Sequence, residues 1–283
     1  MESPLVLNML KNKKSLGQHW LKNRVILDEI ACGVAIGMGC FPEHEDLARA
    51  ARSVSGGHAM PIATPLTVVE IGPGLGTLTS SLFRYFNKVI AVEYDKDLAE
   101  KLPKSFPGKN LEVVNANFLD FDLEKIPQPY MIAGNIPYYI TSPIIRKIIT
   151  TENKPKRVAL LIQKEVAERI LDEKETMLSL LVKNYAKVYP GVVVPKEEFT
   201  PPPKVDSQVI ILEPKDQPEI PEEVFKLIQI GFSAPRKKLA HNLTSLKPKE
   251  EISKILKQLD ISPDARPADL KLKDWERLFG VIM

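Results

Sequence analysis

The sequence has few cysteines and no long apolar run. It contains two cysteines among 283 residues, and no apolar stretch approaches the roughly 20 residues that span a bilayer. Two cysteines in so long a chain favour a reducing, cytoplasmic setting. The apolar run 5–10 follows Glu2 and is too short for a secretory signal. We therefore expect a cytoplasmic protein without a membrane partner.

An excess of charge of one sign is also missing. Lys and Arg together number 39 against 36 Asp and Glu, a net charge of +3, so bulk charge alone does not indicate a nucleic-acid partner. The basic residues are instead grouped, at 11–24 and 236–238. The 283 residues, 44% of them hydrophobic, reach the length at which a single core stops growing. We expect one main domain and a smaller one, with Trp20 and Trp275 packed in cores.

Short apolar runs alternate with helical spacing, which predicts an α/β fold: a doubly wound, mostly parallel, Rossmann-like sheet. Such a sheet binds ligands beyond the carboxyl ends of its strands. A proline-rich segment at 199–212 enters a late strand, and 214–221 is a linker. We expect a main domain at 1–214, with an insertion at about 32–64, and a small all-helical domain at 215–283. The expected strands are 66–71, 89–93, 111–114, 130–133 and 158–163, and helices are expected from 25, 78 and 98.

A glycine-rich turn follows the first of these strands, with Gly72, Gly74 and Gly76 in alternate positions. Glycine allows the backbone to approach a ligand closely. A nicotinamide-dependent dehydrogenase would need Gly-x-Gly-x-x-Gly, but the third required position here is Thr77. Glu70, just before the turn, suits a ligand with a cationic amino-acid end better than a pyrophosphate.

Polar residues end the next two strands. Glu93 stands at the end of the second strand, a position from which a carboxylate can accept hydrogen bonds from two ribose hydroxyls. Asn117 can present its amide oxygen to an adenine amino group. Each residue alone is more often a solvated loop residue, but together on successive strand ends they predict a pocket for S-adenosylmethionine.

The tetrapeptide Asn135-Ile136-Pro137-Tyr138 combines a primary amide, a proline carbonyl and an aromatic ring. Two oxygen acceptors and a flat face suit the exocyclic amino group of a purine. Our hypothesis is that the Asn135 oxygen and the Pro137 carbonyl each accept a hydrogen of adenine N6, which localises its lone pair. Tyr138 would stack on the flipped base and Phe199 would cover its other face.

Seven motifs extend this interpretation in order along the chain, at 14–21, 69–74, 135–138, 163–169, 199–207, 235–239 and 266–270. Together they resemble the small-subunit (16S) ribosomal RNA adenine N6,N6-dimethyltransferase family. The resemblance implies an enzyme that transfers methyl groups from S-adenosyl-L-methionine to N6 of two adjacent adenosines near the 3′ end of that RNA. Its partner would be small-subunit ribosomal RNA within an immature 30S particle, and we expect a monomer off the ribosome.

The resemblance also implies binding residues, with two departures. Asn117 stands where the family usually has Asp, although an amide oxygen still accepts a hydrogen bond. About 35 residues separate Ala31 from Leu66, where the family has a shorter link. Donor contacts are expected for Gln18, His19, Leu21, Glu70, Gly72, Gly74, Glu93, Asn117 and Asn135. RNA contacts are expected for Lys11, Lys13, Lys14, Arg146, Lys147, Arg236, Lys237 and Lys238.

Other functions remain open. A large-subunit RNA adenine methyltransferase of the macrolide-resistance type shares the pocket and the tetrapeptide, although 199–207 and 266–270 favour the small-subunit family. An assembly factor that binds pre-ribosomal RNA without catalysis is disfavoured by the intact Asn135, Pro137 and Tyr138. A DNA amino-methyltransferase would lack the basic helical tail.

A zinc site is disfavoured as well. Cys32, Cys40, His44 and His58 all fall in the insertion, but the two cysteines are eight positions apart (40 − 32). Structural zinc pairs usually lie two to four residues apart. We expect no metal.

Overall fold

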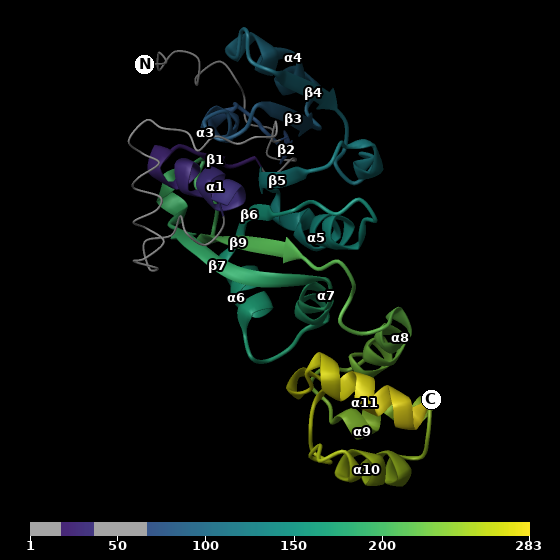
Figure 1. Cartoon of the computed structure of the whole chain (residues 1–283). Coiled ribbons are helices and arrows are strands. Elements are labelled where there is room, and N and C mark those ends of the chain that lie inside the picture. The colour runs from purple at the N-terminus through teal and green to yellow at the C-terminus, as the bar shows by residue number, and fades with distance from the viewer. Residues whose placement is uncertain (1–17, 37–66) are drawn as a thin grey trace. The chain divides into compact units, whose positions relative to one another are not determined.

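The computed structural model describes residues 18–36 and 67–283 and divides into two compact units, each described here by itself (Figure 1). The first unit holds the described residues up to Lys164 together with Pro190–Ile211. The insertion expected at about 32–64 lies almost entirely outside the described residues. No helix within the described ranges has both the length and the apolar composition that a bilayer crossing requires.

A seven-stranded sheet forms the centre of the first unit, in the order β4-β3-β2-β5-β6-β9-β7. The neighbours from β4 to β6 pair in parallel. All five apolar runs predicted to be strands form strands. Those in the middle of the sheet are buried at almost every position, as expected for strands covered on both faces, whereas the edge strand at 111–115 is only partly buried. The strands are β2 (Thr67–Ile71), β3 (Lys88–Glu93), β4 (Leu111–Asn115), β5 (Tyr130–Asn135), β6 (Val158–Gln163), β7 (Ala186–Val194) and β9 (Ser207–Pro214).

The winding of the chain reverses at the centre of this sheet. From β2 the chain proceeds outward to β3 and β4, and from the neighbouring β5 it proceeds the other way to β6. Because such crossovers are right-handed, their helices cover opposite faces and leave a crevice beyond the carboxyl ends of β2 and β5. Ile71 is paired with Gly134, so the loop at Gly72 starts beside Asn135. The helices of this unit are α1 (Arg24–Ile36), α3 (Thr77–Leu82), α4 (Lys96–Ser105) and α5 (Thr141–Thr150).

A short antiparallel ribbon fixes the described start of the chain. β1 (Trp20–Leu21) pairs with β8 (Phe199–Thr200), so that Leu21 lies opposite Phe199. A histidine ring nitrogen next to β1 strengthens the ribbon, since Nδ1 of His19 lies 2.8 Å from the Pro201 carbonyl oxygen. The carbonyl can only accept, so Nδ1 carries the proton. The ribbon brings the described start of the chain beside the segment that precedes β9.

The second unit is mostly helical, and its bounds differ from the expected domain division. It comprises Glu165–Tyr189 as well as Leu212–Met283, whereas the sequence suggested a single cut near residue 214. The reason is packing, because Leu180 is fully buried in the core cluster of the C-terminal helices. The helices after β6 are α6 (Lys164–Leu171), α7 (Met177–Tyr185), α8 (Glu222–Gly231), α9 (Leu239–Asn242), α10 (Lys249–Gln258) and α11 (Leu272–Ile282).

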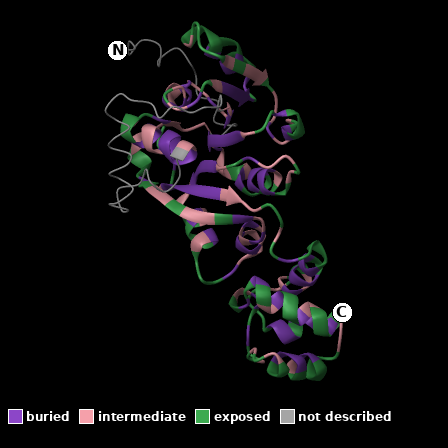
Figure 2. Ribbon diagram, in the orientation of Figure 1, coloured by how far each residue is buried: buried purple, intermediate pink, exposed green. Residues whose placement is uncertain are grey.

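Buried and exposed residues alternate along the helices of this unit (Figure 2). Trp275 belongs to their buried core, as the sequence predicted. Its side chain is completely buried, and its ring centroid lies 6.0 Å from that of Phe232. Gly231, the last residue of α8, packs against the indole so closely that a Cβ there would lie 2.2 Å from the ring. The core of the second unit therefore requires glycine at this position.

Gly231→Ala is expected to lower the free energy of unfolding by about 1–3 kcal/mol, because an added methyl group overpacks a rigid indole. The matched control is Gly280→Ala in α11, where a Cβ meets nothing within 4 Å. Alanine favours an exposed helix interior over glycine, so the control should gain about 0.5–1 kcal/mol. Denaturant unfolding of both variants checks the prediction, and equal effects of the two substitutions would contradict it.

Candidate active site

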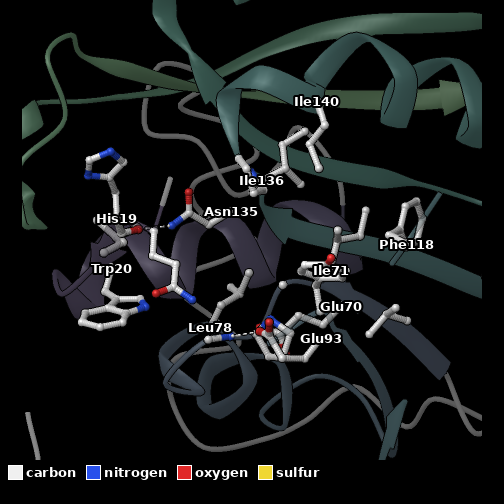
Figure 3. A pocket seen from close by; sticks show the side chains of 18 of the residues that line it. His19, Trp20, Glu70, Ile71, Leu78, Glu93, Phe118, Asn135, Ile136 and Ile140 are labelled. Atoms are coloured by element: carbon white, nitrogen blue, oxygen red, sulfur yellow. Dashed lines mark hydrogen bonds between the residues drawn. The ribbon is translucent and has the colours of Figure 1, made fainter. Parts of the chain in front are cut away.

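A cavity of about 360 Å³ lies at the carboxyl edge of the sheet (Figure 3). It is lined by residues at or just after the ends of four strands: Gly72 after β2, Glu93 at the end of β3, Ala116 after β4 and Asn135 at the end of β5. The segment 18–21 closes another side of it. The cavity therefore lies at the point where the strand order reverses, as expected for this type of sheet.

The glycine turn is held open by a buried carboxylate. Oε2 of Glu93 accepts the backbone N–H of Gly74 at 3.0 Å, and Oε1 accepts that of Asp95 at 2.8 Å. Gly74 has φ of 57°, which side chains resist, and a Cβ there would come within 3.2 Å of the Trp20 indole. Burial raises the pKa of Glu93, although these N–H groups oppose the shift. Glu93 thus shapes the turn while lining the cavity.

A second carboxyl, that of Glu70, is buried at the base of the cavity. Its Oε2 accepts a hydrogen bond from the Thr79 hydroxyl at 2.6 Å, whereas Oε1 is buried without a partner among the described residues. Burial raises the pKa of Glu70 to about 8. A buried carboxyl oxygen without a hydrogen-bond partner is stabilised strongly when a positively charged donor binds to it.

Asn135 is held in one orientation by the main chain of the N-terminal segment. Its Nδ2 donates to the carbonyl oxygen of His19 at 2.9 Å, as the dashed line in Figure 3 marks. A carbonyl oxygen accepts hydrogen bonds only, so the amide nitrogen must face it. The Oδ1 atom of Asn135 is therefore left as the acceptor on this cavity-lining side chain.

Tyr138 is fixed from two sides. Its hydroxyl lies 2.7 Å from Oγ of Ser207, a fully buried residue at the start of β9. Its ring is stacked near that of His19, with centroids 6.0 Å apart and planes inclined by 20°. Burial raises the pKa of Tyr138. The phenol therefore serves as a neutral, oriented surface rather than as a proton acceptor.

The wall after β4 is braced from helix α5. Lys147 donates from Nζ to the Leu119 carbonyl oxygen at 2.7 Å and lies 5.8 Å from the ring centroid of Phe118. Burial lowers the pKa of Lys147. Asn117 in the same loop accepts the Leu119 backbone N–H on Oδ1 at 3.1 Å. Asn117 thus uses one lone pair of its oxygen for the loop and retains the other.

The surroundings of Pro137 and Phe199, both expected to contact the target adenine, differ from those that the hypothesis assumed. The Pro137 carbonyl already accepts the Ile140 backbone N–H at 3.2 Å, so only its second lone pair is available. Phe199 is 2% exposed, lies in β8, and is not among the residues that line the cavity. The structure thus places Phe199 as support for β1 and leaves its expected contact with a base without a geometric basis.

The expected RNA-binding residues are spread over the chain. Arg146 is exposed on α5, next to the half-buried Lys147. Arg236, Lys237 and Lys238 are exposed in the helical unit before α9. Lys238 pairs with Asp264 at 2.5 Å, and Nζ of Lys237 lies 3.2 Å from Nε2 of His241. Lys11, Lys13 and Lys14 lie outside the described residues.

Several residues of the site were not predicted. Trp20 was expected in a core, but it is only half-buried and lines the cavity beside Gly74. Tyr94 and Tyr139 line the cavity and are exposed, and nothing in the sequence pattern marked them. Ser207 lies in the motif at 199–207, but its contact with Tyr138 was not predicted. A serine at the first position of a buried strand is the sequence signal that could have indicated a buried polar contact.

The residues considered for zinc do not form a described site. Cys40, His44 and His58 lie outside the described residues, so Cys32 is the one member of this group that the structure describes. Within 18–36 and 67–283, no three His, Cys, Asp or Glu side chains gather as metal ligands would.

Comparisons with known proteins agree with this geometry. A family model described as ribosomal RNA adenine dimethylase matches residues 9–283. The ribosomal RNA small subunit methyltransferase A of Nostoc is 35% identical to this chain, over 97% of this chain and 99% of its own length. Its counterpart in Synechocystis is 34% identical, over 95% and 96% of the two chains.

Solved structures give the same fold. A dimethyladenosine transferase from Plasmodium falciparum has a TM-score of 0.69 at 28% identity, over 91% of this chain and 95% of its own. The 23S rRNA methyltransferase ErmE has a TM-score of 0.68 at 24% identity, over 93% and 99%. The second likeness shows the fold alone.

The doubly wound sheet and its cavity define a Rossmann-like methyltransferase. The chain belongs to the ribosomal RNA adenine dimethylase family. It is an S-adenosylmethionine-dependent ribosomal RNA adenine dimethyltransferase, as the sequence motifs predicted.

The raised pKa of Glu70 predicts a pH dependence of stability. Between about pH 5 and pH 8 the folded protein holds a proton on Glu70 that the unfolded chain has released. The free energy of unfolding of the free enzyme should therefore fall as the pH rises through this window, by up to about 1.4 kcal/mol per pH unit. Glu70→Gln keeps a neutral acceptor for Thr79 and removes this slope.

Denaturant unfolding of the wild type and Glu70→Gln at several pH values provides the measurement. The stability of the variant relative to the wild type should grow with pH across the window. A difference that stays constant with pH would show that Glu70 titrates at an ordinary value.

Proposed function

We propose that the cavity binds S-adenosylmethionine and the target adenine of small-subunit ribosomal RNA side by side. The enzyme then methylates N6 of two adjacent adenosines near the 3′ end, on an immature 30S particle in the cytoplasm, and acts as a monomer off the ribosome. The observation that carries this proposal is the oriented amide of Asn135 at the strand end next to the glycine turn. The curated relatives, named for the small subunit, support the choice of RNA.

The residues of the cavity fit the methyl donor. The unpaired, buried Oε1 of Glu70 suits the cationic amino-acid end, and the carboxylate of Glu93 suits the ribose hydroxyls. Asn117 retains a lone pair on its oxygen for the adenine amino group of the donor. Gln18, whose Nε2 lies 3.5 Å from Asp95, and Leu21 complete the wall. When bound, S-adenosylmethionine supplies an electrophilic methyl group on a sulfonium.

The acceptor side is built to hold an exocyclic amine. Oδ1 of Asn135 accepts one N6 hydrogen, and the free lone pair of the Pro137 carbonyl is the candidate for the other. Both contacts draw the nitrogen lone pair out of conjugation with the purine ring and aim it. Tyr138 offers its face to the flipped base, held by Ser207 and His19. The methylated amine releases its proton to solvent, so the cavity needs no general base.

RNA binding outside the cavity is electrostatic in this proposal. Arg146 on the first unit and the exposed Arg236, Lys237 and Lys238 on the second carry the charges for phosphate contacts. Affinity for the RNA should then fall with added salt.

Replacing Asn135 with Ala should lower kcat by at least about 100-fold while the affinities for RNA and donor stay near wild type, because only the positioning of N6 is lost. The measurement is transfer of labelled methyl groups to small subunits that lack the modification, followed by nucleoside analysis for N6,N6-dimethyladenosine. Asn153→Ala is the matched control. Its amide bonds the Leu123 and Ile126 carbonyls and does not line the cavity, so kcat should remain within about threefold. Parallel loss of RNA affinity in Asn135→Ala would make Asn135 a structural residue.

Substitutions at the neighbouring residues Arg146 and Lys147 should affect RNA binding and donor binding separately. Lys147→Met removes the brace on Leu119 and should weaken binding of S-adenosylhomocysteine about tenfold, with RNA affinity nearly unchanged. Arg146→Met should leave that affinity unchanged and reduce the salt slope of RNA binding by about one. Calorimetry and filter binding measure the two affinities. If Lys147→Met weakened RNA binding alone, Lys147 would be an RNA contact, as the sequence suggested.

A further inference from the structure

Two exposed tyrosines line the same cavity at different strand ends. Tyr139 is 67% exposed and Tyr94 is 65% exposed, although large aromatic rings are usually buried. Tyr139 belongs to the turn at Tyr138–Ile140, directly after the tetrapeptide. Tyr94 follows Glu93 at the end of β3. The proposed mechanism uses neither ring.

The sheet order assigns the two rings to different sides of the cavity. β2 separates β3 from β5, so the glycine turn lies between the two strand ends. Tyr94 is adjacent to Glu93, which belongs to the donor side. Tyr139 is adjacent to Tyr138 and follows Asn135, which belong to the acceptor side.

The two neighbouring rings of the turn differ in how they are held. Tyr138 is half-buried, with its hydroxyl at Ser207 and its ring near His19. Tyr139 is exposed at the cavity, and among the described residues no hydrogen bond or ring contact holds its side chain. An exposed ring beside a base-flipping pocket is suited to stack on a nucleobase that remains outside.

We propose that Tyr139 forms a stacking subsite for the nucleobase adjacent to the flipped adenosine. This inference rests on the proposed function, in which the substrate has two adjacent adenosines. When one base enters the cavity, its neighbour loses a stacking partner and lies at the rim. Tyr139 replaces that partner and so favours entry of the target base.

The test compares Tyr139→Ala, Tyr139→Leu, Tyr139→Phe and Tyr94→Ala in methyl transfer to small subunits that lack the modification. Stacking on one base predicts that Tyr139→Ala and Tyr139→Leu lower kcat/KM for the subunit about 5- to 100-fold, with KM for the donor unchanged. Tyr139→Phe keeps the ring and should remain near wild type. Tyr94→Ala, with equal exposure, should raise KM for the donor and leave KM for the subunit unchanged. Thermal unfolding confirms that each variant is folded.

A changed neighbour base provides the second measurement. Subunits in which one of the two adenosines is uridine should be methylated more slowly by the wild type at the adenosine that remains, because uracil stacks more weakly. For Tyr139→Ala, the rate at that remaining adenosine should be the same in the two kinds of subunit.

The inference is overturned if the wild type methylates the subunit and Tyr139→Ala does so equally well. It is also overturned if Tyr139→Ala raises KM for the donor alone, or if Tyr139→Phe is as defective as Tyr139→Ala. Failure of the proposed function looks different, since the wild type itself would then transfer no label to small-subunit RNA.

Discussion

The hydrogen bond from the Asn135 amide to the His19 carbonyl is the constraint on which the site depends. At 2.9 Å it determines which end of a nearly symmetric amide faces the cavity. Without this hydrogen bond, the amide would be free to rotate and turn its NH2 group toward the proposed target amine. Both groups are donors, so no hydrogen bond would form between them. The chain therefore uses a main-chain oxygen from residue 19 to make residue 135 an acceptor.

That carbonyl is itself positioned by distant parts of the chain. The ribbon between β1 and β8 fixes the segment that carries His19, and the His19 ring bonds the Pro201 carbonyl. Ser207, a few residues further on, holds the Tyr138 hydroxyl. The N-terminal segment, the tetrapeptide and the proline-rich segment thus form one hydrogen-bonded cluster. This explains why a motif near residue 20 and another near residue 200 belong to the same chemistry.

The proposed donor side of the cavity contains two buried carboxyl groups, and burial determines their properties. Glu93 compensates for its desolvation with two backbone N–H groups, which at the same time set the conformation of the glycine turn. Glu70 accepts its hydrogen bonds from Thr79 on one oxygen, and its second oxygen has no partner among the described residues. The imbalance at Glu70 costs stability in the free enzyme and favours a bound cation. If Glu70 holds the donor as proposed, the same unpaired oxygen that lowers the stability of the free enzyme strengthens binding.

The sequence predicted the central strands because buried parallel strands are continuous apolar runs. Asn135, Glu93 and Glu70, which it placed at the carboxyl edge of the sheet, all line the cavity there. The sequence did not predict the β1–β8 ribbon, since two-residue strands carry no periodicity. The sequence did not indicate that Glu165–Tyr189 groups with the C-terminal helices, because the partners of Leu180 lie 40 or more residues away along the chain. The exposure of Tyr139 and Tyr94 was not predicted, because side-chain exposure depends on the fold and not on local sequence. For the same reason Trp20 was expected in a core, although it lines the cavity.

The most direct test of the account is a crystal structure of the enzyme with S-adenosylhomocysteine and an RNA fragment whose target adenosine is flipped. The account predicts N6 of that adenosine at about 3 Å from Oδ1 of Asn135, with Nδ2 still bonded to the His19 carbonyl. An adenine amine that faces Nδ2, or that lies out of hydrogen-bonding reach of Asn135, would contradict it.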